Sequence, residues 1–263
     1  MEEGIEYIKI QKSKSGNHTT LEDAVAVEAP LEIQIQEFGK EKPRAISVTM
    51  RTPGDDEDLA LGFLFTEGIL HNYSQVKAVK YHGENIVKIY VKEGVEIHLQ
   101  NTERNFYTTS SCGVCGKASI DAIRTKTQFE ISSTTVPSAN VLFSLKDKLV
   151  SEQSLFSKTG GIHAAAIFDS EGKLILMHED VGRHNALDKV IGECFRRGLL
   201  PLNDKTLLLS GRTSFELVQK ATMAGIPTIV SVGAPSSLAV ELARESGQNL
   251  IGFLKNNSYN LYT

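Results

Sequence analysis

The sequence predicts an α/β protein in two parts: a smaller α+β unit followed by a larger unit with three layers in the order α/β/α. In the second half, short apolar runs alternate with amphipathic stretches, which predicts a mostly parallel sheet with helices on both faces. In the first half, apolar and polar side chains alternate with the period of half-buried strands. We therefore expect a smaller domain over residues 1–110, a mobile loop and linker over 111–136, and the larger domain over 137–263.

The composition is that of an ordinary globular protein, with 41% hydrophobic and 23% charged residues among 263. A formal net charge of −4 argues against general nucleic-acid binding. The acidic N-terminus resembles no signal peptide, and no apolar run reaches transmembrane length, so no membrane partner is expected. Three cysteines, an odd number, argue against a disulfide framework. A reducing, cytoplasmic location is therefore expected.

The smaller unit is expected to begin with a strand and a loop within residues 1–20. Residues 55–58 are acidic and precede an apolar run that ends near Gly68. Acidic side chains complement the dipole at a helix start, so we interpret this cluster as a helix start rather than as a metal site. Period-two alternation predicts strands, paired antiparallel, over residues 31–36, 46–50, 76–81, 86–91 and 95–99.

The larger unit is expected to begin with a helix over residues 139–150 that Ser138 caps. Further helices are expected to follow residue 185, Ser214 and Ser236. On the first of these, Cys194 lies on the apolar face and should be buried in the core. Apolar runs predict strands over residues 164–168, 174–177, 206–209, 228–232 and 250–254, with Gly172 in a hairpin turn between the first two.

The most informative stretch is Ser110–Lys117 (SSCGVCGK), which holds Cys112 and Cys115 with a glycine after each. A short helix is predicted to follow, so the helix dipole and Lys117 would lower the thiol pKa of Cys115 and favour the reactive thiolate. Such a pair of thiols suits the transfer of sulfur or of electrons. Three alternatives remain: half of a zinc site, although a second cysteine pair is missing; a thioredoxin-like redox pair; or two inert thiols.

Polar residues follow several predicted strands of the larger unit. His163 enters a strand behind two glycines, and segments beginning at Ser210 and Gly233 each join a strand to a helix. Ligands of open α/β sheets bind beyond the carboxyl ends of strands, where helix N-termini favour anions. We therefore expect an anion-binding crevice here, with Arg212 as its best phosphate ligand.

The segment His178–Asn185 is a further candidate at a strand end. Arg183 would bind a phosphate at the start of the next helix, and Asp180 and Asn185 would recognise the edge of a base or a pterin. The alternative is structural: Asp180 caps the helix and pairs with Arg183.

With these residues identified, the chain resembles the formate dehydrogenase accessory sulfurtransferases, the FdhD family. The resemblance spans almost the whole chain. It rests on Met50–Leu70 (MRTPGDDEDLALGFLFTEGIL), Ser110–Lys117, Thr159–Ala166 (TGGIHAAA), Glu179–Gly192 (EDVGRHNALDKVIG), Ser210–Ala221 (SGRTSFELVQKA) and Ala234–Ala243 (APSSLAVELA).

The resemblance implies a sulfur relay. A cysteine desulfurase would load sulfur onto Cys112 as a persulfide, with Cys115 assisting. The sulfur would pass to the molybdenum or tungsten of a bis(molybdopterin guanine dinucleotide) cofactor that enters formate dehydrogenase. A homodimer fits the family. The implied cofactor contact falls on Phe253, Leu254, Lys255, Asn256, Asn257 and Ser258, and we add His163, Asp180, Arg183, His184, Asn185, Ser210 and Arg212 from the strand ends.

The resemblance also implies a cytidine-deaminase-like fold for the larger domain. Zinc deaminases need His-x-Glu, whereas this chain has His163-Ala164-Ala165, and its cysteine pair comes earlier. Deaminase chemistry and a structural metal are therefore not expected. Two alternatives to the sulfurtransferase remain: a non-catalytic chaperone of the molybdenum cofactor and, less favoured, a zinc-dependent deaminase-like hydrolase.

Overall fold

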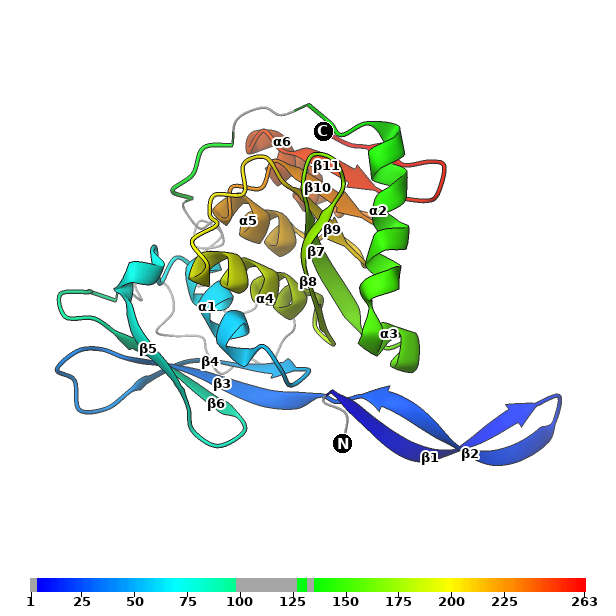
Figure 1. Ribbon diagram of the computed structural model, residues 1–263, viewed down its shortest axis with the longest axis horizontal. Helices are drawn as coiled ribbons and strands as arrows, with labels where there is room; N and C mark the ends of the chain where they lie inside the picture. Colours follow the sequence, from blue (N-terminus) through cyan, green and yellow to red (C-terminus); the bar gives the residue numbers. More distant parts are fainter. Residues whose placement is uncertain (1–3, 98–126, 132–134) are drawn as a thin grey trace.

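The structure, a computed structural model, describes residues 4–97, 127–131 and 135–263. A six-stranded sheet and a four-stranded sheet lie on either side of the helices α1 (Asp56–Thr66) and α4 (Arg183–Arg196) (Figure 1). The α/β class predicted from the sequence, with a smaller α+β unit and a larger layered unit, is confirmed. The boundaries 1–110, 111–136 and 137–263 stay a prediction, because much of the linker lies outside the described residues.

The large sheet is mixed. Its strands, in spatial order, are β12 (Asn260–Leu261), β11 (Asn249–Gly252), β10 (Thr228–Ser231), β9 (Thr206–Leu209), β7 (His163–Phe168) and β8 (Leu174–Asp180). The strands β8, β9, β10 and β11 run in one direction, as a mostly parallel sheet requires, but β7 and β12 run against them. Only β9, β10 and β11 pair in parallel. The α4 crossover makes β8 and β9 run in one direction, and β7 lies between them and runs against both.

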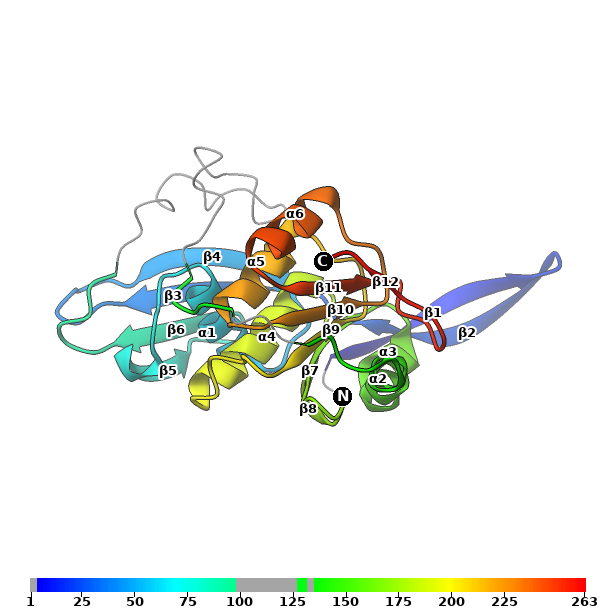
Figure 2. The same cartoon turned by 90° about the horizontal axis from the view of Figure 1, so that it is seen from above.

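Helices cover both faces of this sheet, which gives the α/β/α layers. On one face, α4, α5 (Phe215–Met223) and α6 (Ser237–Glu245) pack against alternate strand residues such as Ala165 and Leu207 (Figures 1 and 2). On the other face, α2 (Ala139–Glu152) buries three leucines against residues such as Ala164, and α3 (Ser154–Thr159) follows it. Ser138 caps α2 as expected.

The small sheet has the order β4 (Arg44–Arg51), β3 (Ala29–Gln36), β6 (Ile86–Val91) and β5 (Val76–Tyr81), and α1 packs on its apolar face. The pair β3–β6 is parallel, so antiparallel pairing holds only for the two outer pairs. The strand expected at residues 95–99 is wrong within the described part, since Val95–Ile97 form no ladder.

The chain begins with a long hairpin of β1 (Ile5–Lys14) and β2 (Asn17–Ala26), which projects from the body of the molecule (Figures 1 and 2). Of the strand and the loop expected in residues 1–20, the strand is confirmed as β1, and the loop is wrong because β2 begins at Asn17. Ser15 and Gly16 make the two-residue turn, both with positive φ (51° and 85°). Turns of this kind match the twist of the strands that they join.

The two units meet where α1 crosses α4 at backbone contact. A Cβ atom added to Gly62 would lie 1.9 Å from the carbonyl oxygen of Asp188, and one added to Gly192 would lie 1.8 Å from that of Asp58. Only glycine fits at either position. Among the described residues, no helix has both the length and the apolar composition that crossing a membrane requires.

Candidate functional site

Five segments that the sequence singled out meet at one edge of the large sheet. The strands β8, β9, β10 and β11 end there, and β7 begins there because it runs the opposite way. The edge therefore carries Asp180, Ser210, Val232 and Phe253 at or just beyond four strand ends and His163 at one strand start. The His163 segment was expected at this edge, and it lies there at the start of β7 because that strand runs against its neighbours.

Hydrogen bonds join neighbouring segments of this edge. Ser210 Oγ accepts from the amide of Ala164 at 2.9 Å, and the Ser210 amide donates to the Ala164 carbonyl at 3.0 Å. The Gly233 amide donates to the Gly211 carbonyl, and the Phe253 amide donates to the Gly233 carbonyl, both at 3.0 Å. The loops therefore hold one another in place, as a preformed binding site requires.

Two histidines of the edge are held neutral. The ring of His163 lies against Gly211, whose added Cβ would be 3.2 Å from His163 Nδ1. Burial, and then the charge of Arg183, lowers the pKa of His163. Burial together with nearby cations lowers the pKa of His184 to about 3, and His184 Nε2 lies 3.3 Å from Ser214 Oγ. Both rings can therefore donate or accept hydrogen bonds here without adding charge.

Several polar groups at the edge lack a partner among the described residues. Gly182 begins α4 with no side-chain cap, and Ser214 precedes α5 as expected but gives it no side-chain cap. Within the described ranges, the buried atoms Arg183 Nε and Thr213 Oγ1 have no hydrogen-bond partner. Arg212 is exposed beside them in the sequence. Uncapped helix N-termini with arginines suit a phosphate group.

Asp180 has a structural role instead of a free carboxylate. It is fully buried, its Oδ2 lies 2.9 Å from Lys189 Nζ and accepts from the Thr52 amide, and its Oδ1 accepts from Gly182 N and Asn185 Nδ2. The expected partner of the structural alternative, Arg183, is therefore replaced by Lys189. These contacts leave neither oxygen of Asp180 available to a base.

Asn185 is engaged in the same way. Its Nδ2 also donates to the Met50 carbonyl at 2.7 Å, and its Oδ1 accepts from Thr49 Oγ1 at 3.1 Å. Both partners belong to β4 of the small sheet. Asn185 and Asp180 thus attach the start of α4 to the smaller unit. Because the polar atoms of both side chains are engaged in these bonds, neither residue is free to make the expected contact with a base.

The segment 253–258 lies at the same edge. Phe253 is exposed and has a positive φ of 53°, which is uncommon outside glycine and frequent at functional sites. Leu254 lies in the core with 1% exposure and its amide donates to the Ser231 carbonyl at 3.1 Å, so the expected contact of Leu254 with a cofactor has no accessible atoms in this structure. Residues 255–258 are exposed, and the Lys255 amide donates to the Ser258 carbonyl.

A cavity of about 490 Å³ lies beside this edge, between α2, α3 and the start of β7. His163 and Ser210 line it together with Gln153, Phe156 and Lys146. The sequence reasoning missed the last three residues. Gln153 and Phe156 belong to no strand-to-helix turn, so no motif marks them.

Cys112 and Cys115 lie outside the described residues, so their predicted role stays a prediction. Cys194, by contrast, is buried as expected, and burial raises the pKa of its thiol to about 12. It is therefore protonated and unreactive.

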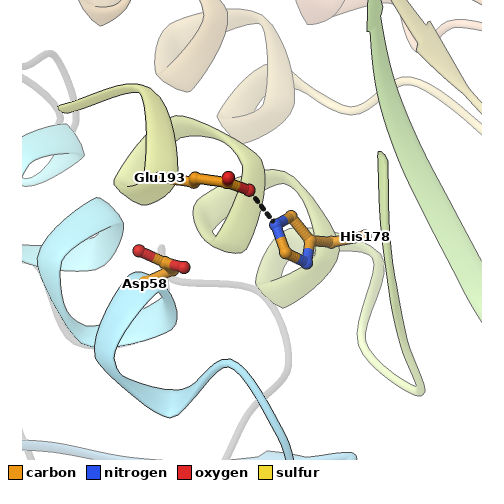
Figure 3. Close-up of side chains that lie close together, drawn as sticks. All are labelled: Asp58, His178 and Glu193. Carbon is orange, nitrogen blue, oxygen red and sulfur yellow. Dashed lines mark hydrogen bonds and ion pairs between the residues drawn. The ribbon is translucent and has the colours of Figure 1, made fainter. Parts of the chain in front are cut away.

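A second titratable cluster joins α1, β8 and α4 (Figure 3). Asp58, His178 and Glu193 offer ligand atoms within 4.8 Å of one another. However, Arg196 donates to both oxygens of Asp58, and the two His178 nitrogens contact Glu193 at 2.8 Å and Asp55 at 3.1 Å. Burial alone would lower the pKa of His178, but the two carboxylates outweigh it and raise the pKa. The charges and hydrogen-bonding atoms of this cluster are therefore paired within it.

With this geometry established, comparison with known proteins decides the family. The sequence model described as "FdhD/NarQ family" matches residues 26–263. The chain belongs to the FdhD/NarQ family. The resemblance noted from the sequence motifs is thereby confirmed.

Relatives of this FdhD/NarQ chain cover nearly its whole length. A protein named sulfur carrier protein FdhD from Streptomyces avermitilis is 47% identical, over 97% of this chain and 92% of its own. One of the same name from Sulfolobus acidocaldarius is 40% identical, over 98% and 96%. The solved structure of a candidate formate dehydrogenase accessory protein from Desulfotalea psychrophila, 24% identical, superposes with a TM-score of 0.76 over 98% and 96%, which supports the fold.

Proposed function

We propose that this FdhD/NarQ chain is a sulfur carrier that takes sulfur from a cysteine desulfurase and transfers it to a molybdenum cofactor destined for formate dehydrogenase. The names of its relatives support the carrier role. The observation that carries the cofactor-binding part is the sheet edge, where five segments place free donors and two uncapped helix N-termini together. Such an edge suits the diphosphate of a guanine dinucleotide.

In the loading step, the Cys112 thiolate attacks the terminal sulfur of the desulfurase persulfide. A bond forms between Cys112 Sγ and that sulfur while the S–S bond of the donor breaks, and the donor leaves as a thiolate. The step needs no external oxidant or reductant, because one S–S bond replaces another.

In the delivery step, the Cys115 thiolate attacks Cys112 Sγ, and the terminal sulfur leaves as hydrosulfide, which the metal of the bound dinucleotide accepts. The two thiols lose two electrons as they form a disulfide, and the sulfane sulfur gains them. A cellular thiol then reduces the disulfide. Arg183 and Arg212 hold the phosphates during this step.

The test is mass spectrometry of the purified chain after incubation with a cysteine desulfurase and cysteine. We expect one added sulfur atom that maps to Cys112, its loss in Cys112→Ala, and retention of that sulfur in Cys115→Ala, because Cys115 acts after loading. Cys194 is the internal control, since its buried thiol should stay unmodified. Sulfur accepted by Cys112→Ala at the wild-type rate would refute the assignment.

A cellular assay separates sulfur transfer from mere cofactor binding. In cells that lack their own copy of this protein, Cys112→Ala should leave formate dehydrogenase inactive while the variant still binds the nucleotide. Wild-type formate dehydrogenase activity with both cysteines replaced would instead favour the non-catalytic chaperone.

A further inference from the structure

His178 of β8 lies beside α4 and the turn before α1, and each of its ring nitrogens contacts a carboxylate (Figure 3). Glu193 Oε2 lies 2.8 Å from Nε2, and Asp55 Oδ2 lies 3.1 Å from Nδ1. A neutral imidazole has one N–H group, so its other nitrogen would point a lone pair at a carboxylate. Only the charged ring donates to both. The pKa agrees: burial lowers the pKa of His178, but the two carboxylates raise it above its ordinary value.

Charged groups face this ring from α1, from α4 and from the turn before α1. They are Asp55, Asp58, Lys189, Glu193, Arg196 and Arg197. Arg196 donates to both oxygens of Asp58 and so neutralises that carboxylate. Asp55 depends on the ring instead, because the hydrogen bond from His178 is the largest influence that lowers the pKa of Asp55. The charge on His178 therefore acts chiefly on the turn that carries Asp55.

Asp55 has two competing uses for its carboxylate. It directly precedes α1, where an aspartate ordinarily has an extended backbone and accepts from the first amides of the helix. Here Asp55 has a left-handed φ of 54°, which is unfavourable outside glycine, and its side chain makes no cap bond. The carboxylate contacts His178 instead. The state of the ring therefore decides between a capped and an uncapped start of α1.

The turn that carries Asp55 also contacts the candidate binding edge. The Thr52 amide donates to Asp180 Oδ2 at 3.1 Å, and Thr52 Oγ1 accepts from the Val181 amide at 3.2 Å. Lys189 Nζ donates to the Thr52 carbonyl at 3.0 Å. Asp180 ends β8, and Val181 leads from there to α4. A change of backbone conformation at Asp55 therefore acts on the bonds that hold the end of β8.

We propose that His178 is a proton-controlled switch for the turn between β4 and α1. While the ring is charged, it holds Asp55 in the left-handed conformation and keeps Thr52 against the end of β8. When the ring loses its proton to solvent, the Asp55 carboxylate caps α1, its backbone becomes extended, and Thr52 moves away from Asp180 and Val181. The effect on ligand affinity rests on the proposed function, whereas the movement of the turn does not.

The direct test is a pH titration of the full chain followed by nuclear magnetic resonance. The ring protons of His178 should titrate with a midpoint above 6.5, the ordinary pKa of histidine. The backbone amides of Thr52, Asp55 and Val181 should shift with the same midpoint, because the turn moves when the ring loses its charge. A midpoint below 6.5, or amides of Thr52 and Val181 that do not follow His178, would overturn the switch.

Asp55→Asn and Glu193→Gln form a matched pair of variants. Each removes one carboxylate partner of His178, so each should lower the midpoint of the ring. Only Asp55→Asn should abolish the shift of the Thr52 amide, because Asp55 belongs to the turn and Glu193 belongs to α4. If Glu193→Gln abolishes that shift as well, the ring acts through α4, and the assignment of the switch to Asp55 is wrong.

Unfolding in urea above pH 6.5 measures the charged link by a second route. There the folded chain holds a proton that the unfolded chain has lost, so stability falls as the pH rises. Relative to His178→Gln, the unfolding constant of the wild type should rise by up to about tenfold per pH unit until the folded-state midpoint is passed. His18→Gln, in the exposed hairpin, should follow the wild type. Parallel curves for the wild type and His178→Gln would contradict the link.

Calorimetric titration with guanosine diphosphate connects the switch to the edge. The wild type should bind it about fivefold more weakly one pH unit above the measured midpoint of His178 than one unit below, and His178→Gln should bind it equally at both. Unchanged affinity while the amides shift would overturn the coupling to the edge. If the wild type binds no guanosine diphosphate at either pH, the proposed nucleotide binding is wrong, and the amide shifts still decide whether the switch exists.

Discussion

Lys189 and Asp180 form a buried ion pair directly behind the candidate site. Both side chains are at most 1% exposed, and Lys189 Nζ also donates to the Thr52 carbonyl at 3.0 Å. Removing one member of such a pair leaves an uncompensated charge in the interior, which is strongly destabilising. Single substitutions of either residue therefore report on folding and not on ligand contact.

His184 makes the stability of the protein depend on pH. Its pKa is about 3 in the folded state, against an ordinary value of 6.5, because burial penalises the charged ring. Between these values the unfolded chain binds a proton that the folded chain does not, so the free energy of unfolding falls as the pH is lowered.

In His184→Gln this dependence should disappear, since glutamine stays neutral. From pH 6.5 to about pH 4, wild-type stability should fall, relative to the variant, by up to about 1.4 kcal/mol per pH unit. Urea unfolding of both proteins across this range measures the difference. Parallel curves would contradict the buried, neutral state of His184.

For single residues, the sequence predicts a functional role when the residue belongs to a recognisable motif at the start or end of a strand. Arg183, Arg212 and His163 follow or precede strands, and the structure places all three segments at one edge. Lys189 and Gln153 were missed because their importance comes from burial. A lysine on a helix, or a glutamine between two helices, is ordinarily solvated, and only tertiary packing determines that it is buried.

Among the elements, the crossing of α1 and α4 is the tightest contact. Because Gly62 and Gly192 have no side chain, the backbone of each helix lies directly against a carbonyl oxygen of the other helix. The buried pair Lys220–Asp188, at 2.9 Å, bonds to Thr66 of α1 and so adds a polar contact to the crossing.

Gly62→Ala should therefore separate the helices and destabilise the fold by more than about 3 kcal/mol, because the new methyl group would lie 1.9 Å from a backbone carbonyl oxygen that has little room to move. Gly161→Ala is the control, with the nearest atom 3.8 Å from its added Cβ and an ordinary φ. Chemical denaturation measures both. Equal stability of the two variants would contradict the close crossing.

Most elements were predictable from periodicity and turn residues, whereas strand direction was not. The hairpin of β7 and β8 follows from Gly172, which takes a φ of 74° in the turn. That β7 inserts between β8 and β9 depends on which apolar faces meet, and no local pattern encodes this. The parallel pairing of β3 with β6 is likewise a tertiary outcome.

In the molecule as a whole, two sheets share one continuous core through α1 and α4, and the hairpin β1–β2 stands apart from it. The family match begins at residue 26, just as the hairpin ends. Near its base, Ile5 is buried, but most residues of both strands are exposed.

Shortening this hairpin should leave the fold intact. If residues 9–22 are removed and Ile8 is joined to Asp23 through an Asn-Gly turn, the free energy of unfolding should change by less than about 1 kcal/mol, because a lone two-stranded ribbon adds little stability. Thermal melting and guanosine diphosphate titration test this. A large loss of stability would show that the ribbon has contacts beyond its base.

The attachment of Asp180 and Asn185 to residues 49–52 has a practical consequence for genetics. A screen for loss of the cofactor binding proposed above will return substitutions in β4 and the turn after it, although these residues belong to the other unit. Such variants will act by letting the start of α4 tilt. A map of functional positions on this protein will therefore include residues 49–52, which support the candidate binding edge without belonging to it.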